Sequence, residues 1–488
     1  MKKVWRDKIT SSQIKMGTPR ILLLNPKFPD YKVKLVERHN RIWQPISLGI
    51  IASMLETQGR DFVFLDANAL GYNVSQILRK IESVGPNIVV LNTAQHDRWQ
   101  NPIPSIKGIA KLTREFTYLK KKPILVLIGP FGTVFPDQTL KDIPYSDFIV
   151  RGEPEVTTVE LINGIIANSY NNIPGISYRR GNKYFHTPDR GYIKDLDDLP
   201  FPAYHLMPMQ RYHHHKSQNK DSNHRFAMVI TSRGCPFKCV FCNLTMLGNR
   251  YRVRSVSNII NEIDLLVKIY GVNFIMFHDL VFTLRRGRAI QICEQLIQRK
   301  YDLTWRCQSR GMNLDVDLLR KMKEAGCVAI EIGIEAPTEE VQSNIKHIPL
   351  HKLVESVQNA RALGFDIYAG HMLGLPGQSY ASEMRSAELF HALGLSCAIT
   401  STTTPYPGTE LYNQGIEEGK IIPNSWDSIV EATGRVGNDL DRKTLLQIRR
   451  TLQRKEYILQ LREGMLRMIR HHDMNIIRKI YGKLKSKI

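Results

Sequence analysis

The chain has 488 residues, an apolar fraction of 42%, a charged fraction of 23% and a formal net charge of +22. This length exceeds what one compact core accommodates, so several domains are expected, and the composition is that of a folded protein rather than a disordered one. No stretch approaches the roughly 18 consecutive apolar residues of a membrane-spanning helix. A soluble or membrane-peripheral protein is therefore expected.

The amino terminus and the cysteines both indicate an intracellular protein. Residues 1–19 form a basic leader without the apolar core or the small-residue cleavage site of a secretory signal. All seven cysteines lie at or after Cys235, and an odd number confined to one half of the chain is a poor disulfide framework. Reduced thiols and a cytoplasmic location are expected.

Residues 20–170 alternate short apolar runs with helix-length segments. Five runs predict strands, at residues 21–24, 61–66, 87–91, 124–128 and 147–150. Continuous apolar strands separated by helices indicate a parallel sheet covered on both faces, so this part is predicted to be a doubly wound α/β domain. Ligands of such domains bind beyond the carboxyl ends of the strands, although ordinary turns are the alternative interpretation of the polar residues there.

The rest of the chain is predicted to hold a linker, a barrel and a helical tail. Residues 171–225 are rich in proline and polar residues and are interpreted as a linker. Within residues 226–410, six strand-and-helix units predict a partial (β/α)6 barrel. Its strands are expected at residues 226–231, 273–277, 303–308, 328–334, 366–372 and 396–402. Residues 411–488 are largely helical in pattern and increasingly basic.

A cysteine loop carries the main chemical signal. Residues 233–242 read Arg-Gly-Cys-Pro-Phe-Lys-Cys-Val-Phe-Cys, which places Cys235, Cys239 and Cys242 just after the first barrel strand. Four-iron clusters normally take four thiolates, so three cysteines leave one iron open for a substrate or cofactor. The alternative is a structural zinc site, whose fourth ligand would come from the histidines at 213–215 or from His224.

The cysteine spacing, the aromatic residue at 241 and the six-unit barrel together resemble the radical S-adenosylmethionine (radical SAM) enzymes. The resemblance continues through five further segments, at residues 251–255, 277–279, 333–335, 374–377 and 404–409. It implies a [4Fe–4S] cluster whose open iron binds S-adenosylmethionine, reductive cleavage to a 5′-deoxyadenosyl radical, and an external electron donor such as flavodoxin or ferredoxin. It also implies that Phe241 lies near the adenine.

Three residues that follow barrel strands are candidates for contacts to S-adenosylmethionine: Asp279, Arg310 and Glu335. The alternative is a structural ion pair between strand ends. The remaining cysteines, at positions 293, 307, 327 and 397, show no paired spacing, so small buried residues are expected there rather than a second cluster.

The doubly wound domain and the segment at residues 151–155, Arg-Gly-Glu-Pro-Glu, resemble the cobalamin-binding subgroup of this family, often called class B. The resemblance implies corrin contacts from eight strand-end residues: Asn25, Thr93, Gln95, His96, Gly129, Phe131, Gly152 and Glu153. Two subgroup positions differ, since proline stands at 154 and at 130 where glycine is usual. The loop at residues 25–30 also lacks the histidine that other cobalamin proteins place below the cobalt, which leaves His96 as the strand-end histidine able to approach the corrin.

The resemblance favours methylation of an unactivated carbon or a phosphinate, on a small-molecule or lipid substrate. A cobalamin-dependent radical cyclase or ring-rearranging enzyme is the alternative, and no residue separates the two. A noncatalytic nucleic-acid-binding protein is a distant alternative suggested by the charge, but it leaves the cysteine loop unexplained, so no nucleic-acid partner is expected.

The basic tail has two interpretations. Residues 442–488 contain 14 Lys or Arg and three acidic residues, which is half of the net charge, and apolar residues recur among them at helical spacing. An amphipathic helix packed on the barrel is one interpretation, and a peripheral contact with an anionic membrane or substrate is the other.

Overall fold

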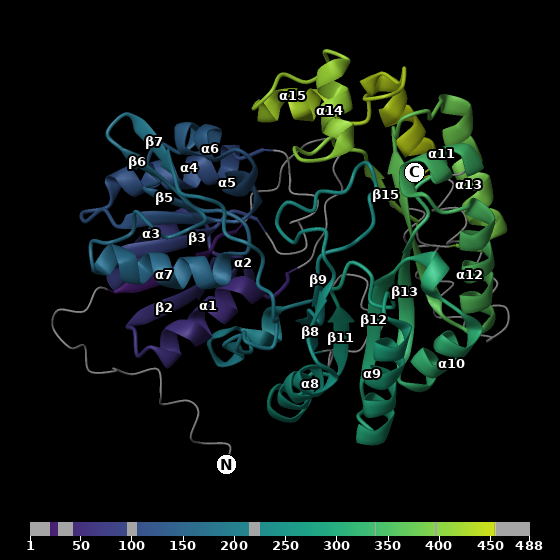
Figure 1. Cartoon of the computed structure of the whole chain (residues 1–488), viewed down its shortest axis with the longest axis horizontal. Helices are drawn as coiled ribbons and strands as arrows, with labels where there is room; N and C mark the ends of the chain where they lie inside the picture. The colour runs from purple at the N-terminus through teal and green to yellow at the C-terminus, as the bar shows by residue number, and fades with distance from the viewer. Residues whose placement is uncertain are drawn as a thin grey trace, which may run out of the picture.

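The computed structural model describes residues 20–27, 42–94, 105–213, 225–336, 338–395, 398–452 and 454. Two sheets, each built mainly of parallel strands, lie side by side with helices packed against them (Figure 1). The expected leader at residues 1–19 and the tail beyond residue 454 lie outside the described residues.

The first sheet is doubly wound, as predicted. Five parallel strands run in the order β2-β1-β3-β4-β5, namely β1 (Ile21–Asn25), β2 (Phe62–Asp66), β3 (Ile88–Asn92), β4 (Ile124–Ile128) and β5 (Phe148–Val150). Alternate residues of β1 face opposite sides, because Ile21 and Leu23 belong to one core and Leu22 and Leu24 to another. The helices of the two layers are α1 (Ile46–Thr57) and α7 (Pro154–Ile166) on one face, and α3 (Val74–Val84) and α4 (Lys107–Glu115) on the other.

Part of the segment expected to be a linker is an extension of this sheet. Strands β6 (Ile176–Arg180) and β7 (Lys183–His186) form an antiparallel hairpin whose first strand pairs with β5. The sheet therefore has seven strands and reaches beyond residue 170, where the domain was expected to end. The linker interpretation is wrong for these two strands.

The second sheet is the predicted half barrel. Its strands are all parallel and follow chain order: β8 (Phe226–Val229), β11 (Phe274–Phe277), β12 (Thr304–Ser309), β13 (Cys327–Gly333), β14 (Asp366–Leu373) and β15 (Ala398–Thr402). Helices line its outer side (Figure 1): α8 (Val256–Tyr270), α9 (Arg286–Arg299), α10 (Val316–Glu324), α12 (Leu350–Ala362) and α13 (Tyr380–Ala392). Helix α11 (Glu339–Lys346) lies beside the cysteine loop, where the Val240 N–H donates to the Ile345 carbonyl. A short pair, β9 (Ser232–Arg233) and β10 (Arg252–Val253), brackets the cysteine loop.

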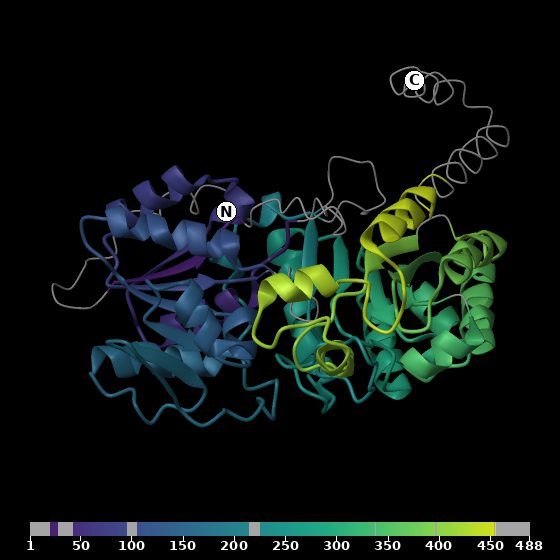
Figure 2. The same cartoon turned by 90° about the horizontal axis from the view of Figure 1, so that it is seen from above.

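The two sheets are connected by the side chain of Gln44 and by two helices near the carboxyl terminus. The side-chain amide of Gln44 bonds to the carbonyl of Phe226 and to the N–H of Met228, and so covers the open edge of β8. At the other end of the barrel sequence, α14 (Glu410–Glu417) and α15 (Trp426–Ala432) reach the first domain (Figure 2). There the ring of Trp426 contacts Phe131 and Phe135 edge to face, each at a centroid distance of 5.0 Å.

Residues 442–452, the part of the basic tail that the structure describes as a continuous helix, pack their apolar side chains on the barrel. Residues 442–452 are helical, and Leu445, Ile448 and Leu452 are buried together with Leu373 of β14. This supports the packed-helix interpretation for that part. In the part of the chain that the structure describes, no helix is long and apolar enough to cross a membrane.

Candidate active site

The three cysteines lie in a loop at the carboxyl edge of the half barrel. Backbone hydrogen bonds hold this loop: Cys235 N–H donates to the carbonyl of Gly248 over 3.2 Å, and Cys242 N–H donates to the carbonyl of Cys239 over 3.0 Å. Asp279, which follows β11, accepts hydrogen bonds from the N–H groups of Thr231 and Ser232, 2.8 and 2.7 Å away. The strand end before the cysteines is thereby anchored.

Burial raises the pKa of all three thiols, and at Cys242 the two neighbouring thiols raise it further. The positive charges of Arg310 and Lys346 oppose this rise at Cys235 and Cys239. The thiols are therefore close enough to influence one another. A bound cation is what would stabilise them as thiolates in this setting.

The zinc alternative requires a fourth ligand beside the three thiols. Among the described residues, no three Cys, His, Asp or Glu side chains could hold one metal ion. His213 instead forms a backbone bridge with Ile42, and its Nδ1 contacts the carbonyl of Arg211. The other three candidate ligands of the zinc alternative, His214, His215 and His224, lie outside the described residues.

Charged residues surround the cysteines. Arg310 donates to the carbonyl of Lys346, and its guanidinium carbon lies 3.7 Å from the centre of the Phe237 ring. Lys346 Nζ lies 3.2 Å from Glu335 Oε1 and 2.8 Å from the carbonyl of Gly333. The structure therefore brings Arg310 and Glu335 to the site, as expected, together with Lys346, which no sequence motif indicated.

Asp279 and Phe241, the other two residues expected to contact S-adenosylmethionine, make contacts within the protein. Asp279 is only 1% exposed, and both its oxygens accept hydrogen bonds from residues 231–232, which assigns it to holding the loop. Phe241 is half-buried and packs against two apolar clusters, one of which contains Leu375. Its contact with adenine stays a prediction.

The carboxyl edge of the first sheet carries a chain of buried polar side chains. Asn92 donates to Asn25 over 3.1 Å, Asn25 donates to Asp66 over 2.9 Å, and the Tyr212 hydroxyl donates to Asp66 over 2.8 Å. Burial raises the pKa of Asp66 and of Tyr212. No histidine stands at the described strand ends of this edge, and Gln95 and His96 lie outside the described residues.

The other expected corrin residues divide into two groups. Thr93 and Gly129 lie together at this edge, so close that a Cβ on Gly129 would come within 2.6 Å of the Thr93 hydroxyl oxygen. Gly152 also stays at the edge, since its N–H donates to Thr133 over 3.0 Å. Phe131, by contrast, packs against Trp426, and both oxygens of Glu153 bind protein donors.

Three of the other four cysteines are buried in the barrel core. Cys293, Cys307 and Cys327 are fully buried free thiols, and burial raises the pKa of Cys293 to about 12. Such thiols are unreactive. Cys397 lies outside the described residues.

Comparison with known proteins identifies relatives over most of the chain. Residues 229–390 match the radical SAM superfamily. The chain is 30% identical over 449 residues to an uncharacterized methyltransferase of Pyrococcus horikoshii, covering 90% of this chain and 93% of that protein. It is 26% identical over 409 residues (81% and 70%) to the anaerobic magnesium-protoporphyrin IX monomethyl ester cyclase of Rubrivivax gelatinosus. It is 25% identical over 472 residues (86% and 85%) to the cytidylyl-2-hydroxyethylphosphonate methyltransferase of Streptomyces wedmorensis.

The fold is also similar to that of a solved structure. The radical SAM methyltransferase TsrM of Kitasatospora setae, with cobalamin and a [4Fe–4S] cluster bound, superposes with a TM-score of 0.65 at 17% identity, covering 83% of this chain and 76% of TsrM. The fold and the cysteine loop define the class of protein, an iron–sulphur enzyme. The chain belongs to the radical SAM superfamily, which confirms the resemblance indicated by the cysteine motif.

Proposed function

We propose that this enzyme uses a [4Fe–4S] cluster, S-adenosylmethionine and cobalamin to methylate an unactivated carbon or a phosphinate. The observation that carries the proposal is the combination, in one chain, of a doubly wound domain and a three-cysteine half barrel. The same combination of fold occurs in TsrM, and the similarity to a methyltransferase extends over nine-tenths of the chain.

In this proposal each of Cys235, Cys239 and Cys242 holds one iron. When bound, the cluster supplies the electron that cleaves S-adenosylmethionine to the 5′-deoxyadenosyl radical. Arg310 and Lys346 offer positive charge for a carboxylate, and Glu335 offers negative charge for an ammonium group. These three side chains suit the zwitterionic amino-acid end of S-adenosylmethionine.

The edge of the first sheet suits a large ligand held without a bond from histidine to cobalt. Asn25, Thr93, Gly129 and Gly152 provide small or neutral groups there, and the buried amides are already hydrogen-bonded to one another. We therefore propose that cobalamin binds at this edge through shape and backbone contacts. Gln95 and His96 remain predicted members of the same loop.

A cyclase or ring-rearranging function is the second candidate, and the similarity to the Rubrivivax gelatinosus cyclase supports it. The two differ in their products. Methyl transfer from S-adenosylmethionine through cobalamin leaves S-adenosylhomocysteine, whereas a cyclase forms 5′-deoxyadenosine without it.

The proposal extends to partners and location. A flavodoxin or ferredoxin would supply the electron, and reduced thiols suit the cytoplasm. Four basic residues of the terminal helix are exposed and could contact an anionic membrane surface or lipid substrate: Arg442, Lys443, Arg450 and Arg454.

The test is anaerobic reconstitution with iron and sulphide, followed by incubation with titanium citrate and S-adenosylmethionine, with and without cobalamin. We expect S-adenosylhomocysteine only when cobalamin is present and 5′-deoxyadenosine in both samples. Cys239→Ala protein should form neither product. 5′-Deoxyadenosine without S-adenosylhomocysteine in the cobalamin sample would favour the cyclase, and protein that binds no iron would contradict the radical SAM assignment.

A further inference from the structure

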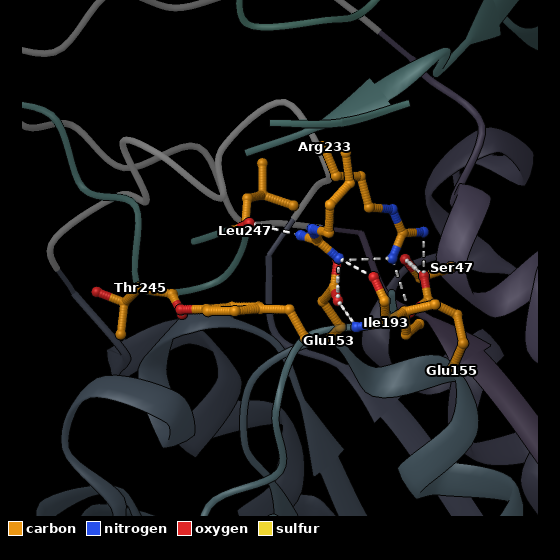
Figure 3. A network of polar contacts seen from close by, with 9 residues as sticks. Ser47, Glu153, Glu155, Ile193, Arg233, Thr245 and Leu247 are labelled. Carbon is orange, nitrogen blue, oxygen red and sulfur yellow. Dashed lines mark hydrogen bonds and ion pairs between the residues drawn. The ribbon is translucent and has the colours of Figure 1, made fainter. Parts of the chain in front are cut away.

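A buried network of ion pairs connects the two segments that flank the cysteine loop to the first domain (Figure 3). Arg233 of β9 donates through both terminal nitrogens to Glu155, over 2.8 and 3.2 Å, and through one of them to Glu153 over 3.1 Å. Arg252 of β10 donates to both oxygens of Glu153, over 2.8 and 3.1 Å. Both glutamates lie at the start of α7.

Every carboxylate oxygen of this network is satisfied. Besides the arginines, the Ser47 hydroxyl donates to Glu155 over 2.8 Å, and the Ile193 N–H donates to Glu153 over 2.8 Å. The side chains of Arg233, Glu153 and Glu155 are 4%, 3% and 0% exposed. Although burial alone would lower it, the two carboxylates raise the pKa of Arg233.

A buried network of this kind contributes more to geometry than to net stability. The desolvation free energy of four buried charges offsets most of the free energy that their attraction contributes. Apolar residues of similar size often stabilise a protein equally well. The bidentate arrangement of guanidinium and carboxylate, however, specifies one relative orientation of the two segments. The network therefore fixes how the segments that flank the cysteine loop are oriented relative to the start of α7.

Only one residue separates Arg233 from Cys235, the first proposed cluster ligand, and the backbone there has little freedom to move. Arg233 is two residues before Cys235, and Gly234 between them has φ +80° and no room for a side chain, because a Cβ would lie 2.1 Å from the Arg250 carbonyl oxygen. Arg252 also donates to the Leu247 carbonyl over 2.6 Å, next to Gly248, whose carbonyl accepts from Cys235. A shift at either arginine would therefore move the cysteine loop.

The path to the other edge is equally short. Glu153 follows Gly152, whose N–H is bonded to Thr133 at the carboxyl edge of the first sheet. This is the edge at which cobalamin is proposed to bind. The network therefore connects the cysteine loop with the carboxyl edge of the first sheet, and its residues lie within a few positions of each.

We propose that Glu153, Glu155, Arg233 and Arg252 form an interdomain clamp, which positions the cluster loop relative to the strand-end edge of the first domain. These are positioning residues, and they act on the step that involves both edges rather than on cleavage at the cluster. This inference rests on the proposed function, since methyl transfer through cobalamin requires both edges whereas radical formation requires only the barrel. The segment at residues 151–155, expected to contact a corrin, thus contributes its two carboxylates to the clamp.

The test compares Arg233→Lys and the milder Arg252→Lys with wild type. Lysine keeps the charge but lacks the planar fork with which Arg233 bridges two carboxylates and Arg252 reaches both Glu153 and the Leu247 carbonyl. The matched control is Arg286→Lys, which alters an exposed pair of similar geometry with Asp315, at 2.7 and 3.0 Å, on the outer side of the barrel. All four proteins are reconstituted with cluster and cobalamin, and both products are measured in the same sample.

We expect the clamp variants to keep the cluster absorbance and to form 5′-deoxyadenosine close to the wild-type amount. S-adenosylhomocysteine should fall by roughly tenfold to 100-fold, because small misplacements of reacting groups have effects of this size. The control should match wild type. A parallel loss of both products, or no change in their ratio, would overturn the proposal.

A second measurement does not depend on the cofactors. In cofactor-free protein, hydrogen exchange of the backbone over residues 243–253 should be faster in Arg233→Lys and in Arg252→Lys than in wild type, and unchanged in Arg286→Lys. If wild type forms no S-adenosylhomocysteine, the proposed function fails while this experiment still tests the clamp. Unchanged exchange in both clamp variants would overturn the clamp itself.

Discussion

The two parallel sheets of this chain end in edges of different chemistry. The edge of the first sheet carries Asn92, Asn25 and Asp66, which are joined in that order by hydrogen bonds. The edge of the half barrel carries three thiols with two cations and a carboxylate beside them. The first edge suits a large ligand recognised by shape, and the second suits a metal cluster bound by thiolates. In the proposed function, the same architectural position would therefore serve two kinds of cofactor, according to which side chains follow the strands.

The largest effect is expected at the barrel edge. Replacement of Cys235, Cys239 or Cys242 by alanine should abolish the visible absorbance of the cluster and all cleavage of S-adenosylmethionine, because each thiolate holds one iron. Cys293→Ala, in the buried core, should retain both. Absorbance spectra and 5′-deoxyadenosine yield after anaerobic reconstitution measure this. Full activity of any of the three loop variants would contradict the assignment.

The next largest effect is expected for the stability contributed by the interdomain clamp. Glu155→Ala leaves the buried Arg233 charge with one carboxylate fewer, and loss of a partner in a buried pair costs about 3–5 kcal/mol. The exposed control Asp315→Asn removes the charge but keeps a side-chain oxygen that can accept from the Leu318 N–H at the start of α10, and it should cost less than about 1 kcal/mol. Urea denaturation of cofactor-free protein gives both values. Similar losses for the two variants would show that the buried network contributes no more than a surface ion pair.

The fold of both sheets was predictable because their strands are continuous apolar runs. All five strands of the doubly wound part and all six of the half barrel occur within a few residues of the predicted positions. The hairpin of β6 and β7 was missed because its strands carry many polar residues at the edge of the sheet. A signal was present, since Gly181-Asn182 between two short strands is a typical two-residue hairpin turn.

The site was predictable only where a local motif exists. The spacing of the cysteines identifies the metal ligands, but the pairing of Glu153 with Arg233 joins residues 80 positions apart, and no local pattern encodes it. Lys346 was missed for the same reason, because it reaches the cysteines from the end of α11. Long-range ion pairs depend on how the two domains pack.

A smaller effect is expected at the basic helix, away from both edges. Each basic residue near an anionic bilayer contributes about 1 kcal/mol, and salt screens this attraction. The test variant replaces four exposed residues by glutamine: Arg442, Lys443, Arg450 and Arg454. The control makes the same change in charge on the first domain: Lys111, Arg114, Lys120 and Lys121.

We expect the test variant, but not the control, to lose co-sedimentation with vesicles containing phosphatidylserine at low salt. If wild-type protein ignores such vesicles, the membrane contact is wrong. If both variants lose binding equally, the attraction is one of overall charge and the terminal helix has no special role.

The smallest effect is a pH dependence of an exposed pair. The hydrogen bond from Arg286, with a smaller contribution from backbone N–H groups such as that of Leu318, lowers the pKa of Asp315 from 3.8 to about 2. Because the folded-state pKa is lowered, the pair stabilises the protein above about pH 4, and this contribution is lost as the pH falls towards 2. Solvent screening keeps this contribution small. Denaturation of Arg286→Met should therefore differ slightly from wild type at pH 6 and converge with it in acid, and a constant difference would contradict the assignment.

The most direct test of two cofactors at two different edges is electron spin resonance of the reconstituted enzyme. We predict two signals in one sample, that of a reduced [4Fe–4S] cluster and that of cob(II)alamin retained after gel filtration. The cobalamin signal should lack nitrogen splitting from a protein imidazole, because the loop at residues 25–30 lacks the histidine that other cobalamin proteins place below the cobalt. Absence of a retained cobalamin signal, or nitrogen splitting that His96→Ala removes, would contradict this account of the first edge.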